Sequence, residues 1–217
     1  MTKSDIQLKQ DIEMELRWDP QLNAAQIGVA VDDGAVSLLG AVDTYAQRCA
    51  AEEATKRVAG VRSFAQDLTV KLATDHARSD AEIAAAVEHA FKWHVYVPST
   101  VTAKVQNGNV LLEGHVDSHY QSDAAMLAVR SLKGVSSVYN AIEIRPLVSA
   151  EQVKDKVEAA LERQAKADAS SIKINTMDRV VTLTGTASSW RAIEDAANAA
   201  WAAPGVAQVV DRIVLST

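Results

Sequence analysis

The chain has 217 residues, 48% hydrophobic and 23% charged, which is the balance of a folded globular protein and excludes a disordered or fibrous one. Its net charge is −6, and residues 1–74, 75–147 and 148–217 are each acidic by count, which argues against a nucleic-acid partner because phosphate binding needs clustered Lys and Arg. The single cysteine, Cys49, excludes an internal disulfide and is expected to be a small buried residue.

The N-terminus runs directly into an amphipathic helical pattern, without the apolar core or small-residue cleavage site of a secretion signal. No apolar run approaches the ~20 residues that a membrane-spanning helix needs. We therefore expect a cytoplasmic protein that is at most peripheral to a membrane, and a periplasmic one only if the N-terminus was trimmed.

A pair of glycines 20 positions apart, the second followed by valine, occurs three times. The pairs are Gly40 and Gly60, Gly114 and Gly134, and Gly185 and Gly205. Successive copies are 74 and then 71 residues apart, about the size of a small domain. The sequence therefore predicts three domains, at residues 1–74, 78–147 and 148–217. Short linkers between them favour packed domains over a flexible string.

Each repeat begins with a serine followed three residues later by Gln or Glu, the capping box that starts a helix. The pairs are Ser4 with Gln7, Ser79 with Glu82, and Ser149 with Gln152. Apolar residues then recur at helical spacing, which predicts one buried helix face. These residues are Leu8, Ile12 and Leu16, then Ile83, Val87 and Phe91, then Val153, Val157 and Leu161.

Two strands and a turn follow the helix. Alternating apolar residues around Val29, Ala103 and Ile174 predict the first strand. Tight turns are expected at residues 32–34, 107–109 and 177–179, and the third, which lacks glycine, is expected to be longer or differently shaped. The second strand carries its apolar residues on one face. Those residues are Val36 and Leu38, Val110 and Leu112, and Val181 and Leu183.

A second helix is expected after the first glycine of each pair, with Asp43, Asp117 or Ser188 as N-cap and the second glycine as its left-handed C′ residue. A last strand completes each α-β-β-α-β unit, and the right-handed crossover lets it lie parallel to one hairpin strand. The strand order stays open. The predicted fold is α+β: three tandem domains, each a two-layer sandwich of two helices on a three-stranded mixed sheet.

The glycine and valine pattern resembles the BON domain, a bacterial module named for osmotically induced and nodulation proteins. The first copy shows it in residues 29–42, with Gly60-Val61 and residues 67–70, and the other copies repeat it at Gly114, Gly134, Gly185 and Gly205. The resemblance covers nearly the whole chain. It implies an α/β sandwich module that binds phospholipid membranes in osmotic-shock and envelope-maintenance proteins, and a family without enzymatic activity.

Aromatic residues at helix ends are the candidate contact residues. Trp18 and Trp93 follow the first helix at equivalent positions, and Trp190 takes the place of Tyr45 and His119 near the start of the second helix. Such a ring can fill the end of a core, contact another protein or anchor at a membrane interface. The candidate lipid or interface residues are Trp18, Trp93, Trp190, Tyr45 and Tyr120.

All five histidines fall in the middle repeat, but no cysteine accompanies them, so we expect surface histidines and no metal site. No nucleophile elbow or phosphate loop is present, and we expect neither enzymatic activity nor a cofactor. The predicted function is a non-catalytic, membrane-associating stress-response module. The alternative is a self-associating scaffold, an oligomer that binds or passes small solutes that the sequence does not identify.

Overall fold

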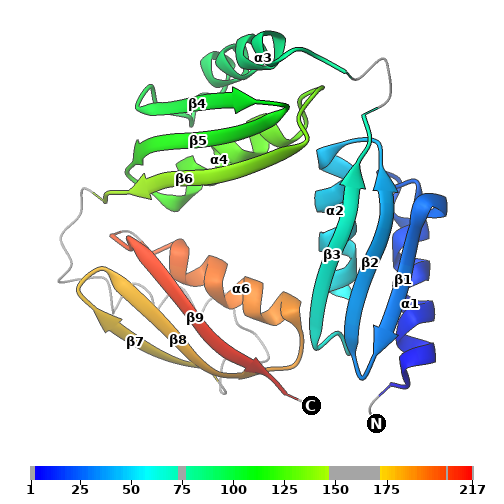
Figure 1. The fold of residues 1–217 in the computed structure, drawn as a ribbon. Helices are drawn as coiled ribbons and strands as arrows, with labels where there is room; N and C mark the ends of the chain where they lie inside the picture. Colours follow the sequence, from blue (N-terminus) through cyan, green and yellow to red (C-terminus); the bar gives the residue numbers. More distant parts are fainter. Residues whose placement is uncertain (1–2, 73–76, 147–171, 204, 217) are drawn as a thin grey trace.

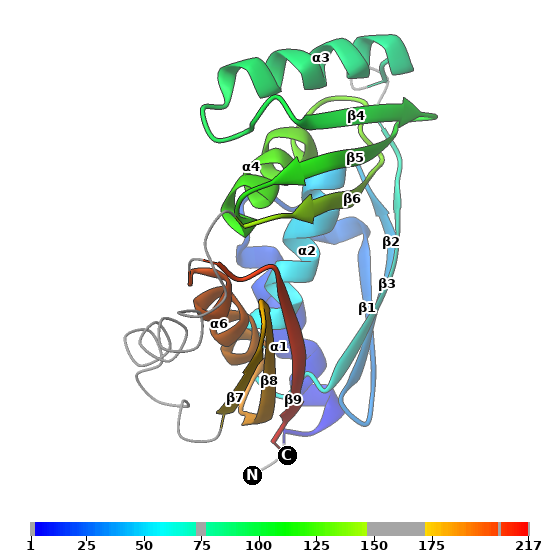
Figure 2. The same ribbon diagram turned by 90° about the vertical axis from the view of Figure 1, so that its left-hand side faces the viewer.

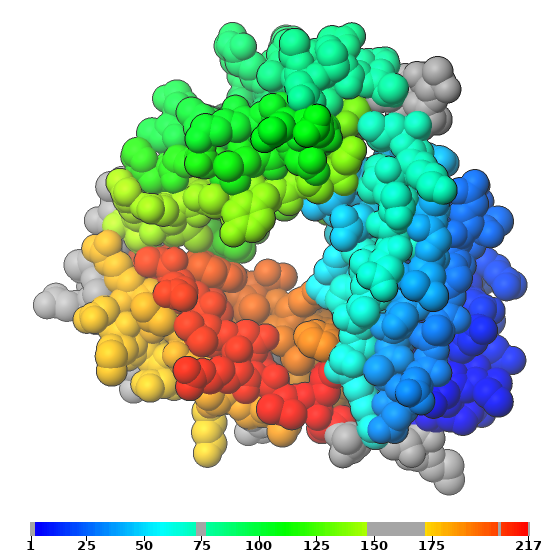
Figure 3. Space-filling model, in the orientation of Figure 1, coloured from blue at the N-terminus to red at the C-terminus, as the bar shows by residue number. Residues whose placement is uncertain are grey.

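The computed structural model describes residues 3–72, 77–146, 172–203 and 205–216. They form three α+β domains arranged in a ring (Figure 1), and the space-filling view in Figure 3 shows an opening at its centre. Figure 2 shows that the sheets lie toward one face of the ring and the second helices of the domains behind them. Each domain encloses its own hydrophobic core.

The elements follow the predicted order. The first domain contains α1 (Asp5–Trp18), the short 3-10 helix η1 (Ala24–Gln26), β1 (Ile27–Asp32), β2 (Ala35–Val42), α2 (Tyr45–Arg57) and β3 (Ser63–Val70). The second contains α3 (Asp80–Trp93), β4 (Val101–Gln106), β5 (Asn109–Val116), α4 (His119–Arg130) and β6 (Ser137–Ile144). The described part of the third contains β7 (Ile172–Met177), β8 (Val180–Ala187), α6 (Trp190–Trp201) and β9 (Gln208–Leu215).

The strand order, which the sequence left open, places the second hairpin strand at the centre of each sheet. The three orders are β1-β2-β3, β4-β5-β6 and β7-β8-β9. In each sheet the hairpin is antiparallel and the last strand pairs parallel with the central one, as the crossover helix requires. The predicted α+β class with three mixed sheets is confirmed.

Capping boxes start both described first helices, as predicted. The Ser4 and Ser79 side chains accept hydrogen bonds from the N–H groups of Gln7 and Glu82, whose side chains accept in return. Leu8, Ile12 and Leu16 are buried on α1, as are Ile83 and Val87 on α3. The first helix predicted for the third domain lies outside the described residues. Its predicted residues are Ser149, Gln152, Val153, Val157 and Leu161.

In the first two domains an aspartate directly after the capping serine clamps the hairpin turn, a contact that was not predicted from the sequence. The Asp80 carboxylate accepts hydrogen bonds from the N–H groups of Asn107 and Gly108, at 2.8 and 2.9 Å. Asp5 binds the first turn in the same way. Asn107 and Gly108 both have positive φ, as a two-residue hairpin turn requires. The clamp therefore ties the start of the first helix to the far end of the hairpin.

The third repeat lacks the carboxylate of this clamp and the turn glycine. It carries Ala150 where the others have aspartate, and Arg179 where the others have the turn glycine. Its turn still has two residues, because Met177 pairs with Val180, so the connection is not longer. It is differently shaped, as the alternative predicted, because Arg179 lacks the positive φ of Gly34 and Gly108. Asp178 supplies a positive φ of 54° there. Aspartate is one of the side chains that tolerate this conformation.

We expect Asp80→Ala to destabilise the second domain by about 1–3 kcal/mol, since it removes two charge-assisted hydrogen bonds to the turn. Asp80→Asn keeps one acceptor oxygen and should cost about half as much. Urea unfolding of both variants measures the difference. Equal stability of Asp80→Ala and the wild type would show that the clamp contributes nothing.

The first glycine of each pair lies inside the central strand and not at its end. Gly40, Gly114 and Gly185 have φ of 119°, 123° and 125°, and the strands continue two residues beyond them. A Cβ at Gly40 would overlap the carbonyl oxygen of Gln26, and one at Gly114 that of Thr100. The backbone of the neighbouring strand thus approaches so closely that only glycine fits.

Both predicted boundaries of the second helix were displaced. The N-caps are Thr44, Ser118 and Ser189, one residue after the predicted Asp43, Asp117 and Ser188, because the central strand runs past its glycine. Gly60, Gly134 and Gly205 lie two or three residues beyond the C-cap and not at C′. An extra tight turn, such as Leu132 N–H to Val129 O, ends the helix first. Gly60, Gly134 and Gly205 do have the positive φ that was expected of them.

Candidate functional site

Each domain contacts the next through the first residue of its second helix. Tyr45, His119 and Trp190 occupy this position on α2, α4 and α6. Tyr45 packs against the core of the second domain, and Trp190 against that of the first. The His119 ring stacks on Trp201 of the third domain, with ring centroids 4.2 Å apart and an interplanar angle of 16°. The three interfaces, 1–2, 2–3 and 3–1, therefore close the ring by one repeated mode.

Charged pairs accompany two of these interfaces. At the 1–2 interface the Arg130 guanidinium lies 3.0 Å from the Glu53 carboxylate. At the 3–1 interface Lys56 Nζ lies 2.9 Å from Glu194 Oε1. Lys56, Arg130 and Trp201 occupy corresponding positions near the ends of the second helices, so the cation of two interfaces is replaced at the 2–3 interface by the indole that stacks on His119.

Burial at the interfaces shifts several pKa values. Burial raises the pKa of the Tyr45 hydroxyl, against a hydrogen bond from the Val138 backbone that lowers it. Burial would lower the pKa of Lys56, but hydrogen bonds to Glu194 and Glu52 outweigh it and leave the pKa above its ordinary value. Burial lowers the pKa of His119, and the nearby Asp123 carboxylate only partly opposes this. The 2–3 interface therefore favours neutral histidine.

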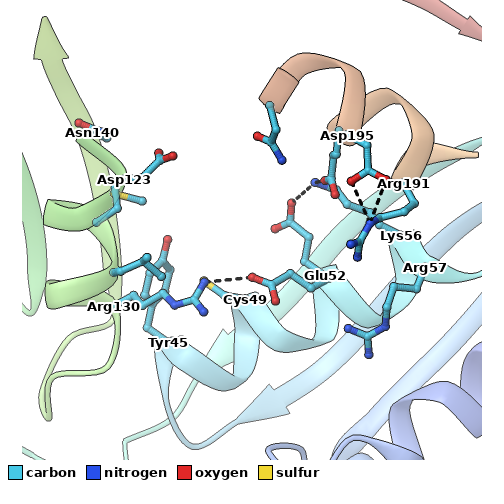
Figure 4. A pocket seen from close by; sticks show the side chains of 15 residues that line it. Tyr45, Cys49, Glu52, Lys56, Arg57, Asp123, Arg130, Asn140, Arg191 and Asp195 are labelled. Carbon is cyan, nitrogen blue, oxygen red and sulfur yellow. Dashed lines mark hydrogen bonds and ion pairs between the residues drawn. The ribbon is translucent and has the colours of Figure 1, made fainter. Parts of the chain in front are cut away.

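A cavity of about 670 Å³ lies at the centre of the ring between α2, α4 and α6 (Figure 4). Its four cations are all ion-paired: Lys56 with Glu52 and Glu194, Arg57 with Glu15 and Asp19, Arg130 with Glu53, and Arg191 with Asp195. Cys49, expected in the core, is half-buried and lines this cavity. Two of these pairs, Lys56–Glu194 and Arg130–Glu53, link domains to one another. Among the described residues, every cation that lines the cavity is already paired with a carboxylate.

The two tryptophans at the ends of the first helices face solvent. Trp18 is 84% exposed and Trp93 76% exposed, so neither fills the end of a core. Tyr120 is also exposed, and its ring meets that of Tyr96 edge-on at 5.0 Å between centroids. Trp190 and Tyr45, by contrast, lie in the interdomain contacts. The five candidate residues therefore separate into an exposed group and an interface group.

The end of α3 carries a continuous run of exposed residues that includes Trp93 and Tyr96. Residues 92–96, Lys-Trp-His-Val-Tyr, are all exposed. The Trp93 indole N–H donates a hydrogen bond to His89 Nε2 at 3.0 Å. The sequence analysis missed Val95 and Tyr96, although the run of apolar residues after a helix ending in Lys-Trp is visible in the sequence. We call residues 92–96 with Tyr120 the α3-end surface.

Two further kinds of feature are clusters of metal-ligating side chains and helices able to cross a bilayer. Within residues 3–72, 77–146, 172–203 and 205–216, no three His, Cys, Asp or Glu side chains come together as metal ligands. Among the same residues, no helix combines the length and the apolar character needed to cross a bilayer.

In their described parts the three domains repeat the same order of strands and helices, and together they form a tandem array of small α+β modules. The BON domain model matches the chain three times, over residues 4–71, 79–146 and 149–217. The chain therefore belongs to the BON domain family. It is similar to osmotically-inducible protein Y of Escherichia coli (strain K12), at 30% identity over 129 residues, which are 57% of this chain and 64% of that protein. The match thus spans less than two thirds of the relative's length.

Solved structures with some similarity include CdsD, a structural protein of the Type III secretion system of Chlamydia trachomatis. It is 13% identical, with 97% of this chain and 92% of CdsD covered and a TM-score of 0.26. The PrgH periplasmic domain is 12% identical, with 88% and 96% covered and a TM-score of 0.24. TM-scores this low carry no inference about this chain.

Proposed function

We propose that this BON-domain protein is a non-catalytic module of the osmotic or envelope stress response that attaches peripherally to phospholipid surfaces through the exposed aromatic residues of its first helices. Similarity to an osmotically inducible protein supports the stress role. The exposure of Trp18 and Trp93, at equivalent ends of α1 and α3, is the observation that carries the membrane role. Indole rings prefer the boundary between hydrocarbon and water.

Apolar insertion suits this chain better than electrostatic attachment. The chain carries a net charge of −6, which repels anionic lipid at neutral pH. Insertion of exposed indole and aliphatic groups is favourable regardless of that charge.

The domain limits proposed are residues 1–74, 78–147 and 148–217, and the proposed location is the cytoplasmic side of a membrane.

The alternative, a solute-binding scaffold, has weaker support from the geometry. The ring is closed within one chain, so its central opening needs no oligomer. The cations lining the cavity are paired with carboxylates, and a charged solute would have to break those pairs. Attachment through the helix ends requires no such rearrangement.

We expect Trp18→Ala and Trp93→Ala each to weaken binding to neutral phosphatidylcholine vesicles by roughly 30–250-fold, since about half of an indole surface, on the order of 100 Å², would leave the apolar phase. Flotation at high salt measures the binding. Tyr139→Ala is the matched control, because Tyr139 is 69% exposed on β6. Its neighbour Val138 packs on the second core, so Tyr139 projects from the opposite face of the sheet. Failure of the wild type to float would contradict the proposal.

A further inference from the structure

We propose that the α3-end surface is a pH-dependent membrane anchor, in which protonation of His89 and His94 frees Trp93 and makes the surface cationic, so that the second domain binds anionic phospholipid more strongly in acid. This inference rests on the proposed function and adds its regulation. It also assigns the lipid contact chiefly to the second of the three domains.

Trp93 is held by a bond that only neutral histidine can form. Its indole N–H donates to Nε2 of His89, one turn earlier on α3, and the two rings lie 5.9 Å apart at 45°. A protonated imidazole has no lone pair left to accept this bond. Imidazole side chains generally change charge between pH 5 and 8. Acidification therefore breaks the hydrogen bond between the Trp93 indole and His89, and the indole is then free to insert into a membrane.

His94 places the second charge next to the same indole. It is the C-cap of α3, and its backbone N–H bonds to Ala90 O and Phe91 O. A cation at this position interacts favourably with the negative end of the helix dipole. Lys92, on the other side of Trp93, is already charged and its side chain is 69% exposed. Protonation thus places two imidazolium cations beside Trp93, next to the Lys92–Glu88 ion pair.

Protonation of His89 and His94 cancels the acidic charge of the second domain. Residues 75–147 carry a formal charge of −2 with neutral histidines. They contain every histidine of the chain, and His89, His94 and His115 are exposed. Charging His89 and His94 alone raises the formal charge of the domain from −2 to 0. The other two domains contain no histidine and stay acidic, so attraction to an anionic surface would arise in the second domain alone.

Other charged groups near α3 are already engaged. On α3, Glu88 pairs with Lys92, Asp80 clamps the turn, and Glu82 completes the capping box. On β4, Lys104 pairs with Glu113 of β5. On α4, His119 pairs with Asp123, and Arg130 pairs with Glu53 of the first domain. In the described part of the chain, no carboxylate is paired with His89 or His94 that would cancel their charge.

The test is flotation of the full chain with phosphatidylcholine vesicles containing 30% phosphatidylglycerol, at pH 7.5 and pH 5.5. Each cation gained near an anionic surface strengthens binding roughly fivefold, so two predict a gain of about 25-fold at pH 5.5. His89→Gln/His94→Gln keeps a hydrogen-bond acceptor but cannot be charged, and should remove most of this gain. His115→Gln, exposed on β5, is the matched control and should keep it.

The outcomes separate this inference from the proposed function. Circular dichroism first establishes that each variant is folded at both pH values. Equal binding at both pH values, an unchanged gain in His89→Gln/His94→Gln, or the same gain on pure phosphatidylcholine would overturn the anchor while leaving membrane attachment intact. A wild type that binds no vesicle at either pH would overturn the proposed function itself.

Discussion

We expect Gly40→Ala to destabilise the first domain by about 2–6 kcal/mol. Gly40 has a φ of 119°, which costs a residue with a side chain roughly 1–3 kcal/mol. Its Cβ would also overlap the carbonyl oxygen of Gln26, and overpacking costs about another 1–3 kcal/mol. A domain of this size has only on the order of 5 kcal/mol of stability in total. Most of it would be lost.

Gly28→Ala is the matched control for this substitution. Gly28 lies in the same hairpin, lacks a positive φ, and an added Cβ would meet Leu39 O at an ordinary 3.7 Å. We expect a change within about 1 kcal/mol, in the stabilising direction, because alanine restricts the unfolded chain. Amide hydrogen exchange of first-domain peptides distinguishes the two variants. Similar exchange in both would show that the close approach of the strands is not required.

We expect Trp190→Ala to open the ring at the 3–1 interface. Trp190 is packed against the core of the first domain, and replacing a partly buried indole costs about 2–3 kcal/mol, a factor of roughly 30–150 in the ratio of closed to open ring. Small-angle X-ray scattering should show a larger radius of gyration. Circular dichroism should stay close to that of the wild type, because each domain keeps its own core.

Trp93→Ala removes an indole of the same size from an exposed position and should leave the radius of gyration unchanged. A larger radius of gyration in Trp190→Ala than in Trp93→Ala would show that the Trp190 side chain itself closes the ring. A Trp190→Ala protein with the dimensions of the wild type would mean that the Lys56–Glu194 pair and its surroundings hold the third domain in place without the indole.

Local chemistry made much of the fold predictable. Ser4 and Ser79 marked the helix starts, and alternation around Val29, Ala103 and Ile174 marked strands that are present. The boundaries around Gly40, Gly114 and Gly185 were not predictable in this way, because a glycine is read as the end of a strand. Here each glycine lies within a strand, and Gly40 and Gly114 allow the backbone beside them to approach closely. That approach is a tertiary contact, which sequence spacing does not reveal.

The candidate site was predictable only in part. The equivalence of Tyr45, His119 and Trp190 was visible in the repeat, but the domain that each residue contacts was not. Interdomain contacts depend on a few side chains from helices of different repeats, and no periodicity records them. Lys56 and Glu194, which pair across the 3–1 interface, are 138 positions apart in the chain. The exposure of Trp18 and Trp93 likewise became known only with the structure.

The 3–1 interface closes the ring between domains that no peptide segment joins directly, yet both belong to one molecule. Tethered partners meet at an effective concentration in the millimolar range, whatever the amount of protein in solution. A contact that includes the Trp190 indole and the Lys56–Glu194 ion pair can therefore keep the third domain bound to the first without the affinity that two separate proteins would need. Dilution that would dissociate a ring of three separate chains leaves this one closed, and its shape does not depend on how much of the protein the cell makes.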